Sequence, residues 1–298
     1  MSGTIDLSKL PAPAVLDPLD FETILAGMRA KLLQLYPAAA DVIDLESEPL
    51  QKLLQVGAYQ QLVLRARVND AARACMLAYA TGTDLDNLAA LLAVERLVLD
   101  PGNPGALPPV PAVMESDARL RQRAQLALEG ETVAGSVGSY TFHALSASAQ
   151  VKDVAIDSPM PGTVRVTVMA ADGNGTPSAG LLATVAAQLS ADDIRPLTDT
   201  VVVQPAGVVP FAVTASLIVY PGPAPAPILA AAQAALADYL AEHARLGHDV
   251  TLSGLYACLH RPGVQRVVLA SPAADVVIAP TQVGHCTAVT VTLGATDV

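Results

Sequence analysis

One long helical pattern, between residues 45 and 80, constrains the fold of this chain more than any other stretch. It has no proline after Pro49 and a single glycine, Gly57. Apolar and small residues recur in alternating steps of four and three, which predicts one narrow stripe on a helix about 45 Å long. The stripe comprises Leu50, Leu54, Gly57, Gln61, Leu64, Val68, Ala71, Cys75 and Ala78. Because small residues alternate with Leu and Val, the backbone of a neighbouring helix could come close.

Two interpretations of this helix follow from its pattern. It could be a packed helix within one domain, or it could belong to a bundle that is shared with other chains. Pro49 suits the first turn, and Glu46 and Glu48 favour the positive end of the helix. Burial within a single short domain rarely covers every side of such a helix, so the pattern alone leaves both interpretations open.

Proline and glycine divide the rest of the chain. Residues 1–18 are rich in proline and predict an extended arm, and residues 19–99 predict a helical region in which Asp20 is the N-cap of the first helix. Pro101, Gly102, Pro104 and Gly105 lie in a predicted linker over 100–111, the clearest domain boundary of the chain.

After residue 111, Val-rich alternating runs mix with helical segments, which is typical of α+β domains. We expect a first small α+β domain over 112–206 and a second over 207–298. Residues 151–159 and 264–272 are similar in sequence, and each segment follows a predicted short helix, which suggests a duplicated helix–strand module. The predicted fold class is therefore α+β, with a helical N-terminal region that contains a long bundle-forming helix.

Composition excludes several partners. A net charge of -11 disfavours a nucleic-acid partner, since phosphate binding needs clustered Lys and Arg. No apolar run approaches the length of a membrane helix, and the N-terminus lacks the layout of a signal peptide, so we expect a soluble protein without membrane insertion. The three cysteines, Cys75, Cys258 and Cys286, have no regular spacing and predict buried free thiols without a disulfide framework.

Candidate catalytic and metal sites are weak in this sequence. The glycines of residues 130–136 have the spacing of a phosphate-binding loop, but no lysine precedes Ser136. The alternative to a structural protein is a metal-dependent or hydrolytic enzyme that uses Cys258, His260, His285 or Glu115, with Cys286 as a further zinc ligand. Neighbouring His and Cys residues do not chelate from regular helix or strand, so we predict no enzyme, no metal and no cofactor.

Segments distributed along almost the whole chain resemble the baseplate J family of contractile phage tails and R-type pyocins, in its P2-like branch. Their order and coverage, rather than any one motif, carry the resemblance. They are Leu10–Pro13, Leu19–Glu22, Leu35–Pro37, Leu45–Leu50, Arg67–Asn69, Ala71–Arg73, Gly82, Asp84–Asp86, Pro111–Asp117, Val133–Gly138, Arg195–Pro196, Tyr220–Pro223, Arg245–Gly247 and Gly263–Val267.

The resemblance implies a structural baseplate wedge subunit. In related contractile machines, two copies of this family's wedge protein join one copy of a second wedge protein through a three-helix core bundle. The α+β parts link neighbouring wedges into a six-fold ring around the spike hub, and the ring holds the sheath initiator and the tail fibres. On this interpretation the chain assembles in the bacterial cytoplasm and ends in the tail baseplate of the released particle.

The resemblance also assigns expected roles to residues. The bundle contacts are Leu50, Leu54, Leu64, Val68, Ala71 and Cys75. The same sequence would occupy two inequivalent positions in each wedge, so we expect a hinge at Pro101, Gly102, Pro104 and Gly105.

Overall fold

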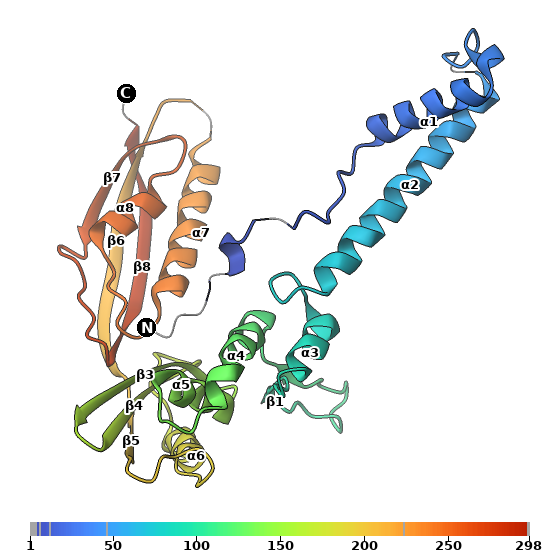
Figure 1. Cartoon of the computed structure of the whole chain (residues 1–298). Coiled ribbons are helices and arrows are strands. Elements are labelled where there is room, and N and C mark those ends of the chain that lie inside the picture. The colour runs from blue at the N-terminus through green and yellow to red at the C-terminus, as the bar shows by residue number, and fades with distance from the viewer. Residues whose placement is uncertain (1–4, 6, 12, 46, 223, 297–298) are drawn as a thin grey trace. The chain divides into compact units, whose positions relative to one another are not determined.

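The computed structural model describes residues 5, 7–11, 13–45, 47–222 and 224–296, and it confirms the α+β class, with a helical N-terminal region followed by sheet domains (Figure 1). The helices are α1 (Phe21–Leu35), α2 (Pro49–Ala74), α3 (Gly82–Ala90), α4 (Asp117–Gly130), α5 (Val137–Ala147), α6 (Ala179–Leu189), α7 (Pro225–His243) and α8 (Leu252–Leu259), with 3-10 turns at Leu7–Lys9 and Pro37–Ala39. The strands are β1 (Val98–Asp100), β2 (Val113–Met114), β3 (Val151–Met160), β4 (Thr163–Ala170), β5 (Thr200–Pro205), β6 (Gly207–Val219), β7 (Val264–Ser271) and β8 (Gln282–Thr296).

The chain forms two compact units. We call the first the helical unit: it contains the described residues up to Glu95, together with Asp117–Ala124. The second, the sheet unit, contains Arg96–Ser116 and the described residues from Gln125 onward. Within the described residues the chain therefore passes between the units three times, and one of these crossings lies inside α4.

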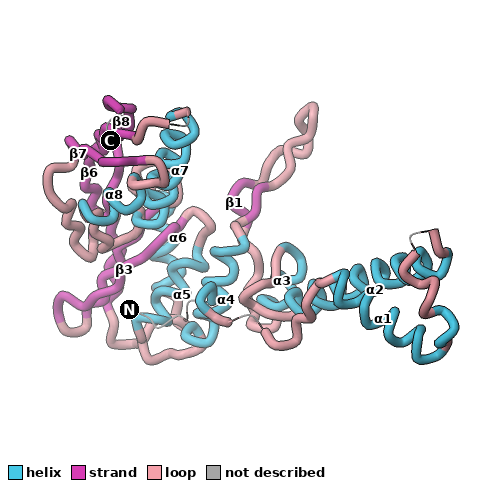
Figure 2. The backbone as a smooth tube through the Cα atoms, turned by 90° about the horizontal axis from the view of Figure 1, so that it is seen from above, coloured by secondary structure: helices cyan, strands magenta, loops and turns pink. Residues whose placement is uncertain are grey.

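The helical unit is built on the antiparallel pair α1 and α2 (Figures 1 and 2). Asp20 caps α1 as predicted, because its carboxylate accepts hydrogen bonds from the backbone N–H groups of Glu22 and Thr23. The pair encloses a small core of Ile24, Leu25 and Ala58, against which Phe21, Met28, Leu54 and Leu62 pack. Two helices can bury only one side of each other, so most of α2 stays outside this core.

The long helix ends earlier than its sequence pattern predicts. Residues 75–80 leave the helix through turns in which the N–H groups of Tyr79 and Ala80 both donate to the carbonyl of Met76. The guanidinium of Arg121 donates to the carbonyls of Leu77 and Ala80 at 2.7 and 2.6 Å. A distant arginine thus satisfies carbonyl groups of the turns that follow the helix, which sequence periodicity could not show.

The Pro/Gly segment predicted as a linker forms a hairpin. Its base is the antiparallel pair β1–β2, and Asn103 and Val110 exchange two backbone hydrogen bonds beyond it. The N–H of Gly102 donates to the Asp100 carboxylate at 2.8 Å, and Gly102 itself has a φ of +66°. A glycine in the left-handed region and a polar side chain that accepts backbone N–H groups favour a tight turn over an extended linker.

Two three-stranded sheets form the sheet unit. The central sheet has the order β3-β4-β5, with β4 antiparallel to β3 and parallel to β5. The C-terminal sheet has the order β7-β6-β8, with β6 antiparallel to β7 and parallel to β8. The similar segments 151–159 and 264–272 thus form β3 and β7, the antiparallel edge strand of each sheet, and each follows a short helix.

Each sheet buries one face under helices. Helices α5 and α6 cover the central sheet over a core that includes Tyr140, Leu145, Val166, Val168 and Leu189. Helices α7 and α8 cover the C-terminal sheet over a core that includes Leu217, Leu236, Leu255 and Leu259. Residues of β6 alternate between this core and the opposite face, as expected for a strand with one buried side.

The two sheets join directly, since Ala206 alone separates β5 from β6. A small apolar cluster of Met169, Ala206 and Val283 fills the junction, with Val208, Ala244 and Leu246 packed against it. Backbone hydrogen bonds add to this contact: the N–H of Ala206 donates to the Val168 carbonyl, and the N–H of Gly207 donates to the Thr281 carbonyl.

Candidate functional site on the long helix

A row of exposed apolar side chains lies on α2 in the helical unit. Six large side chains of this helix are between 45% and 67% exposed. They are Leu53, Val56, Tyr59, Val63, Leu64 and Val68. At about 100° per residue they share one side of the helix, opposite the side that packs on α1. Large apolar side chains that gather on one face of a helix mark an interaction surface. We call these six residues the α2 face.

The predicted bundle residues are divided between the α1 contact and the α2 face. Leu54 packs against the core under α1, and Leu50 is half-buried. Leu64 and Val68 belong to the α2 face, with exposures of 63% and 50%. Ala71 is exposed on the same side of α2. Cys75 is exposed just after the helix ends, so the prediction of a buried thiol is wrong at this position. Their role in a bundle stays a prediction.

Four residues of the α2 face were absent from the predicted stripe: Leu53, Val56, Tyr59 and Val63. Leu53, Val56 and Val63 carry a helical signal of their own, because they follow each other at intervals of three and seven residues. The single stripe read from the sequence lies between the side that α1 covers and the side that stays exposed. The apolar surface of α2 is thus broader than one heptad seam, which suits contact with more than one helix.

The charge of α2 differs in sign from that of the whole chain. The helix contains four basic residues, Lys52, Arg65, Arg67 and Arg73, and one acidic residue, Asp70. Arg73 and Asp70 form an ion pair along the helix, with 3.7 Å between their charged atoms. A basic helix in a chain of net charge -11 favours a partner surface with acidic residues beside apolar ones.

The side chain of Asn69 joins α2 to the segment before α1. Asn69 is only 4% exposed, its Oδ1 accepts the backbone N–H of Asp17 at 2.9 Å, and its Nδ2 donates to the Asp17 carbonyl at 2.8 Å. The Asn69 side chain thus bonds to both the N–H and the carbonyl of Asp17, as the backbone of a neighbouring β-strand would. It fixes the residues before α1 along the second half of α2.

The predicted hinge residues all lie in the β1–β2 hairpin. Pro101, Pro104 and Gly105 are exposed, and the N–H of Gly105 donates to the Asn103 side chain at 3.0 Å. Gly102 is held most tightly, since a Cβ at this position would lie 2.5 Å from the carbonyl oxygen of Val110. The hinge role of the four residues stays a prediction, now placed on a hydrogen-bonded hairpin.

The alternative zinc or hydrolytic residues lie in separate environments. The Cys258 thiol is buried and donates to the carbonyl of Leu255 at 3.2 Å, while the Cys286 thiol donates to Ala288. Burial raises the pKa of both thiols, which favours the protonated form over the thiolate that metals bind. Glu115 is buried, and its carboxylate accepts the backbone N–H of Leu97 at 3.0 Å. Among the described residues, no three His, Cys, Asp or Glu side chains are grouped so that they could hold a metal ion.

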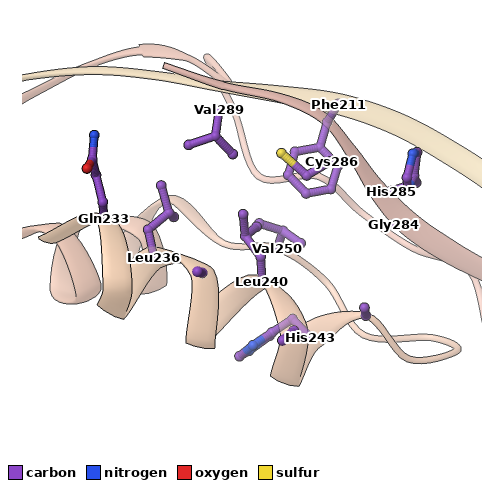
Figure 3. Close-up of a pocket in the computed structure, with 13 residues that line it drawn as sticks. Phe211, Gln233, Leu236, Leu240, His243, Val250, Gly284, His285, Cys286 and Val289 are labelled. Atoms are coloured by element: carbon purple, nitrogen blue, oxygen red, sulfur yellow. The ribbon is translucent and has the colours of Figure 1, made fainter. Parts of the chain in front are cut away.

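A pocket of about 440 Å³ lies between α7 and the start of β8 (Figure 3). Its walls are mainly apolar, and His243, His285 and Cys286 lie at its margin. His243 stacks on Tyr239, with 4.0 Å between the ring centroids, and its Nδ1 bonds to the Tyr239 carbonyl. That histidine is engaged by its own helix, so the pocket offers an apolar surface more than a reactive group.

Among the helices that the structure describes, none combines the length and the apolar character that a membrane crossing requires.

Three family models match successive parts of the chain. The baseplate J-like N-terminal domain matches residues 46–103, the central domain matches 132–205, and the C-terminal domain matches 211–292. The first match contains α2, the second contains the central sheet, and the third runs from within β6 to within β8 of the C-terminal sheet. The chain therefore belongs to the baseplate J family.

The chain is also similar to individual proteins. The chain is 48% identical to baseplate protein J of Escherichia phage P2 over 298 residues, which cover 98% of this chain and 99% of that protein. Among solved structures, a chain of the anti-feeding prophage baseplate matches with a TM-score of 0.42 and 19% identity. That match covers 61% of this chain and 44% of the other, so the chain spans less than half of that neighbour.

Proposed function

We propose that this chain is a structural wedge subunit of a contractile-tail baseplate, and that the α2 face is its main contact with the other wedge subunits. Family membership and the high identity to a phage baseplate protein support the baseplate assignment. The exposed apolar side of α2 is the observation that supports the wedge contact.

In this proposal, two copies of the chain and one copy of a second wedge protein form a three-helix core bundle through α2. One neighbouring helix would cover Leu64 and Val68, and the other would cover Val56 and Val63, since these pairs lie toward opposite margins of the α2 face. The second protein would offer acidic residues to Arg65, Arg67 and Arg73. The chain acts by assembly and carries no catalytic role.

The sheet unit would then join neighbouring wedges into a ring around the spike hub, where the sheath initiator and tail fibres attach. Assembly would take place in the bacterial cytoplasm before release of the particle. Residues 98–114 would supply the adjustment between two inequivalent copies in each wedge, through movement at Pro101, Gly102, Pro104 and Gly105.

The test is co-purification of the chain with the products of the neighbouring tail genes, comparing Leu64→Asp with Ala30→Asp. Leu64 is on the α2 face, whereas Ala30 is exposed on α1. An unpaired carboxylate buried in a bundle costs several kcal/mol, so Leu64→Asp should abolish the complex while the chain stays folded. Ala30→Asp should leave the complex intact. Unchanged co-purification of Leu64→Asp would refute the role of the α2 face.

A further inference from the structure

Strand β8 is an edge strand of unusual length and composition. It has fifteen residues, Gln282–Thr296, and it pairs in parallel with β6 along its whole length. No other strand of the described structure pairs with it, and a single bridge from Leu246 to Val283 meets its first residues. From Ala288 to Gly294 no strand of the described structure lies beside its outer edge, although the Val291 carbonyl accepts a long hydrogen bond from the Gln233 side chain at 3.5 Å and the Ala288 carbonyl accepts one from the Cys286 thiol. This edge is therefore available to a further strand.

The other edges of the two sheets carry features that discourage strand addition. Strand β3 has Lys152, Asp153 and Asp157, strand β7 has Arg266, and β5 is only six residues long and ends in Pro205. Strand β8 has neither a charged residue nor a proline. Natural sheets usually protect long edges with such residues, so an unprotected long edge points to an edge that is covered in the assembled protein.

The residues at the centre of β8 are arranged symmetrically about Val291. Thr290 and Thr292 flank it, then Val289 and Leu293, then the small residues Ala288 and Gly294. Two identical strands that pair antiparallel about a two-fold axis place equivalent positions opposite each other, so a symmetric sequence matches like with like. Val289 and Leu293 are 50% and 38% exposed, although both lie on the face that α7 and α8 cover elsewhere.

The apolar pocket beside β8 can receive side chains of an added strand. Val289, Phe211 and Cys286 form its sheet side, and α7 contributes Leu236 and Leu240 (Figure 3). Ala237 and Ala241 also line it from α7, and these small side chains leave its margin open. A partner strand centred on Val291 would place its own leucine opposite Val289, at the mouth of this pocket.

We propose that β8 pairs antiparallel with β8 of a second copy of this chain, with Val291 on the two-fold axis, so that the two C-terminal sheets form one continuous six-stranded sheet. Val289 then faces Leu293 of the partner subunit, and Thr290 faces Thr292 of the partner subunit. Copies of a chain with net charge -11 repel each other, and an uncharged strand is where they can approach at least cost. The inference rests on the proposed function, because it names the surface through which copies from adjacent wedges join.

The first test is sedimentation of the full chain carrying Val289→Lys or Val268→Lys. Val268 is the matched control, because it is 44% exposed on β7, the opposite edge strand of the same sheet. Both variants are made in a Leu64→Asp background so that association through α2 does not contribute. We expect the parent to form a concentration-dependent dimer, Val289→Lys to weaken it by about a hundredfold or more, and Val268→Lys to leave it unchanged. A monomeric parent, or equal dimers in all three, would overturn the proposal.

The second test fixes the register. In a Cys75→Ser background, the double variant Thr290→Cys and Thr292→Cys should form disulfides between subunits under mild oxidation, because these positions face each other across the axis. Moving the pair to Ala288→Cys and Thr290→Cys removes the match and should abolish the cross-link. Equal cross-linking of both pairs would contradict pairing about Val291.

These tests separate the inference from the proposed function. Val289→Lys in an otherwise native chain should still co-purify with the second wedge protein, since the α2 face is intact. If that complex forms and the β8 tests fail, only the inference is wrong. If Leu64→Asp leaves the complex intact while the β8 dimer forms, the α2 assignment fails instead.

Discussion

The carboxylate of Asp153 accepts the backbone N–H of Leu246 at 3.0 Å, across 93 residues of sequence. Asp153 lies on β3 of the central sheet, and Leu246 follows α7 in the C-terminal sheet domain. The other carboxylate oxygen accepts the N–H of Val154 at 2.9 Å. This half-buried carboxylate therefore joins the two sheet domains beside the apolar junction of Met169, Ala206 and Val283.

This contact predicts a pH-dependent stability of the sheet unit. Burial raises the pKa of Asp153, and it outweighs the hydrogen bonds from Leu246 and Val154 and the charges of Arg245 and His248, which lower it. The folded state then binds more protons than the unfolded state between the ordinary and the raised pKa. The free energy of unfolding should therefore fall as the pH rises through that interval, and recover as the pH is lowered.

Asp153→Asn tests this prediction by denaturant unfolding at several pH values. The amide cannot titrate, and it can accept only one of the two backbone N–H groups. We expect a loss of about 1–3 kcal/mol and no fall in stability across the interval. Asp157→Asn on the same strand is the control, because Arg165 lowers the pKa of exposed Asp157 and any contribution has the opposite sign. An unchanged pH profile in Asp153→Asn would contradict the assignment.

The β1–β2 hairpin predicts a difference between two glycines of the proposed hinge. Gly102→Ala places a Cβ against the Val110 carbonyl and a side chain at positive φ, so we expect it to loosen the hairpin by about 1–3 kcal/mol. Gly105→Ala meets only the Asn103 side chain, at 3.5 Å, and should have little effect. Hydrogen exchange of the Asn103 and Val110 amides measures both variants. Equal protection in the two would show that Gly102 is not required.

The attachment of the N-terminal arm predicts an effect of Asn69 on protease sensitivity. Asn69→Ala removes both hydrogen bonds to Asp17, so residues before α1 should be cleaved faster by a non-specific protease. The control variant Asp70→Ala, at the exposed neighbouring position, should be cleaved at the same rate as the parent protein. Parent-like cleavage of Asn69→Ala would mean that other contacts hold the arm.

Local features of the fold could be predicted from the sequence, whereas long-range ones could not. The Asp20 cap and the strands at β3 and β7 follow from nearby residues, because caps and alternation are local signals. The contact of Asp153 with Leu246 and the bonds of Arg121 to the turns after α2 join residues that are far apart in sequence. No periodicity reports such contacts.

The sequence predicts only part of the candidate site, again because contacts between distant segments decide which residues are buried. Leu64 and Val68 were read from a helical stripe and are exposed on α2, whereas Leu54 of the same stripe packs under α1. Periodicity finds the apolar sides of a helix, but it cannot say which side its own chain covers. Leu53, Val56 and Val63 also have helical spacing, but only the position of α1 in the structure shows that their side of α2 is exposed.

Native mass spectrometry of the chain, expressed with the neighbouring tail genes, would show directly whether it forms a wedge. We predict a complex of two copies of this chain with one copy of a second tail protein, in which the α2 face is protected from hydrogen exchange. A chain that binds none of the tail proteins, or a complex in which Leu53, Val63 and Leu64 stay unprotected, would contradict it.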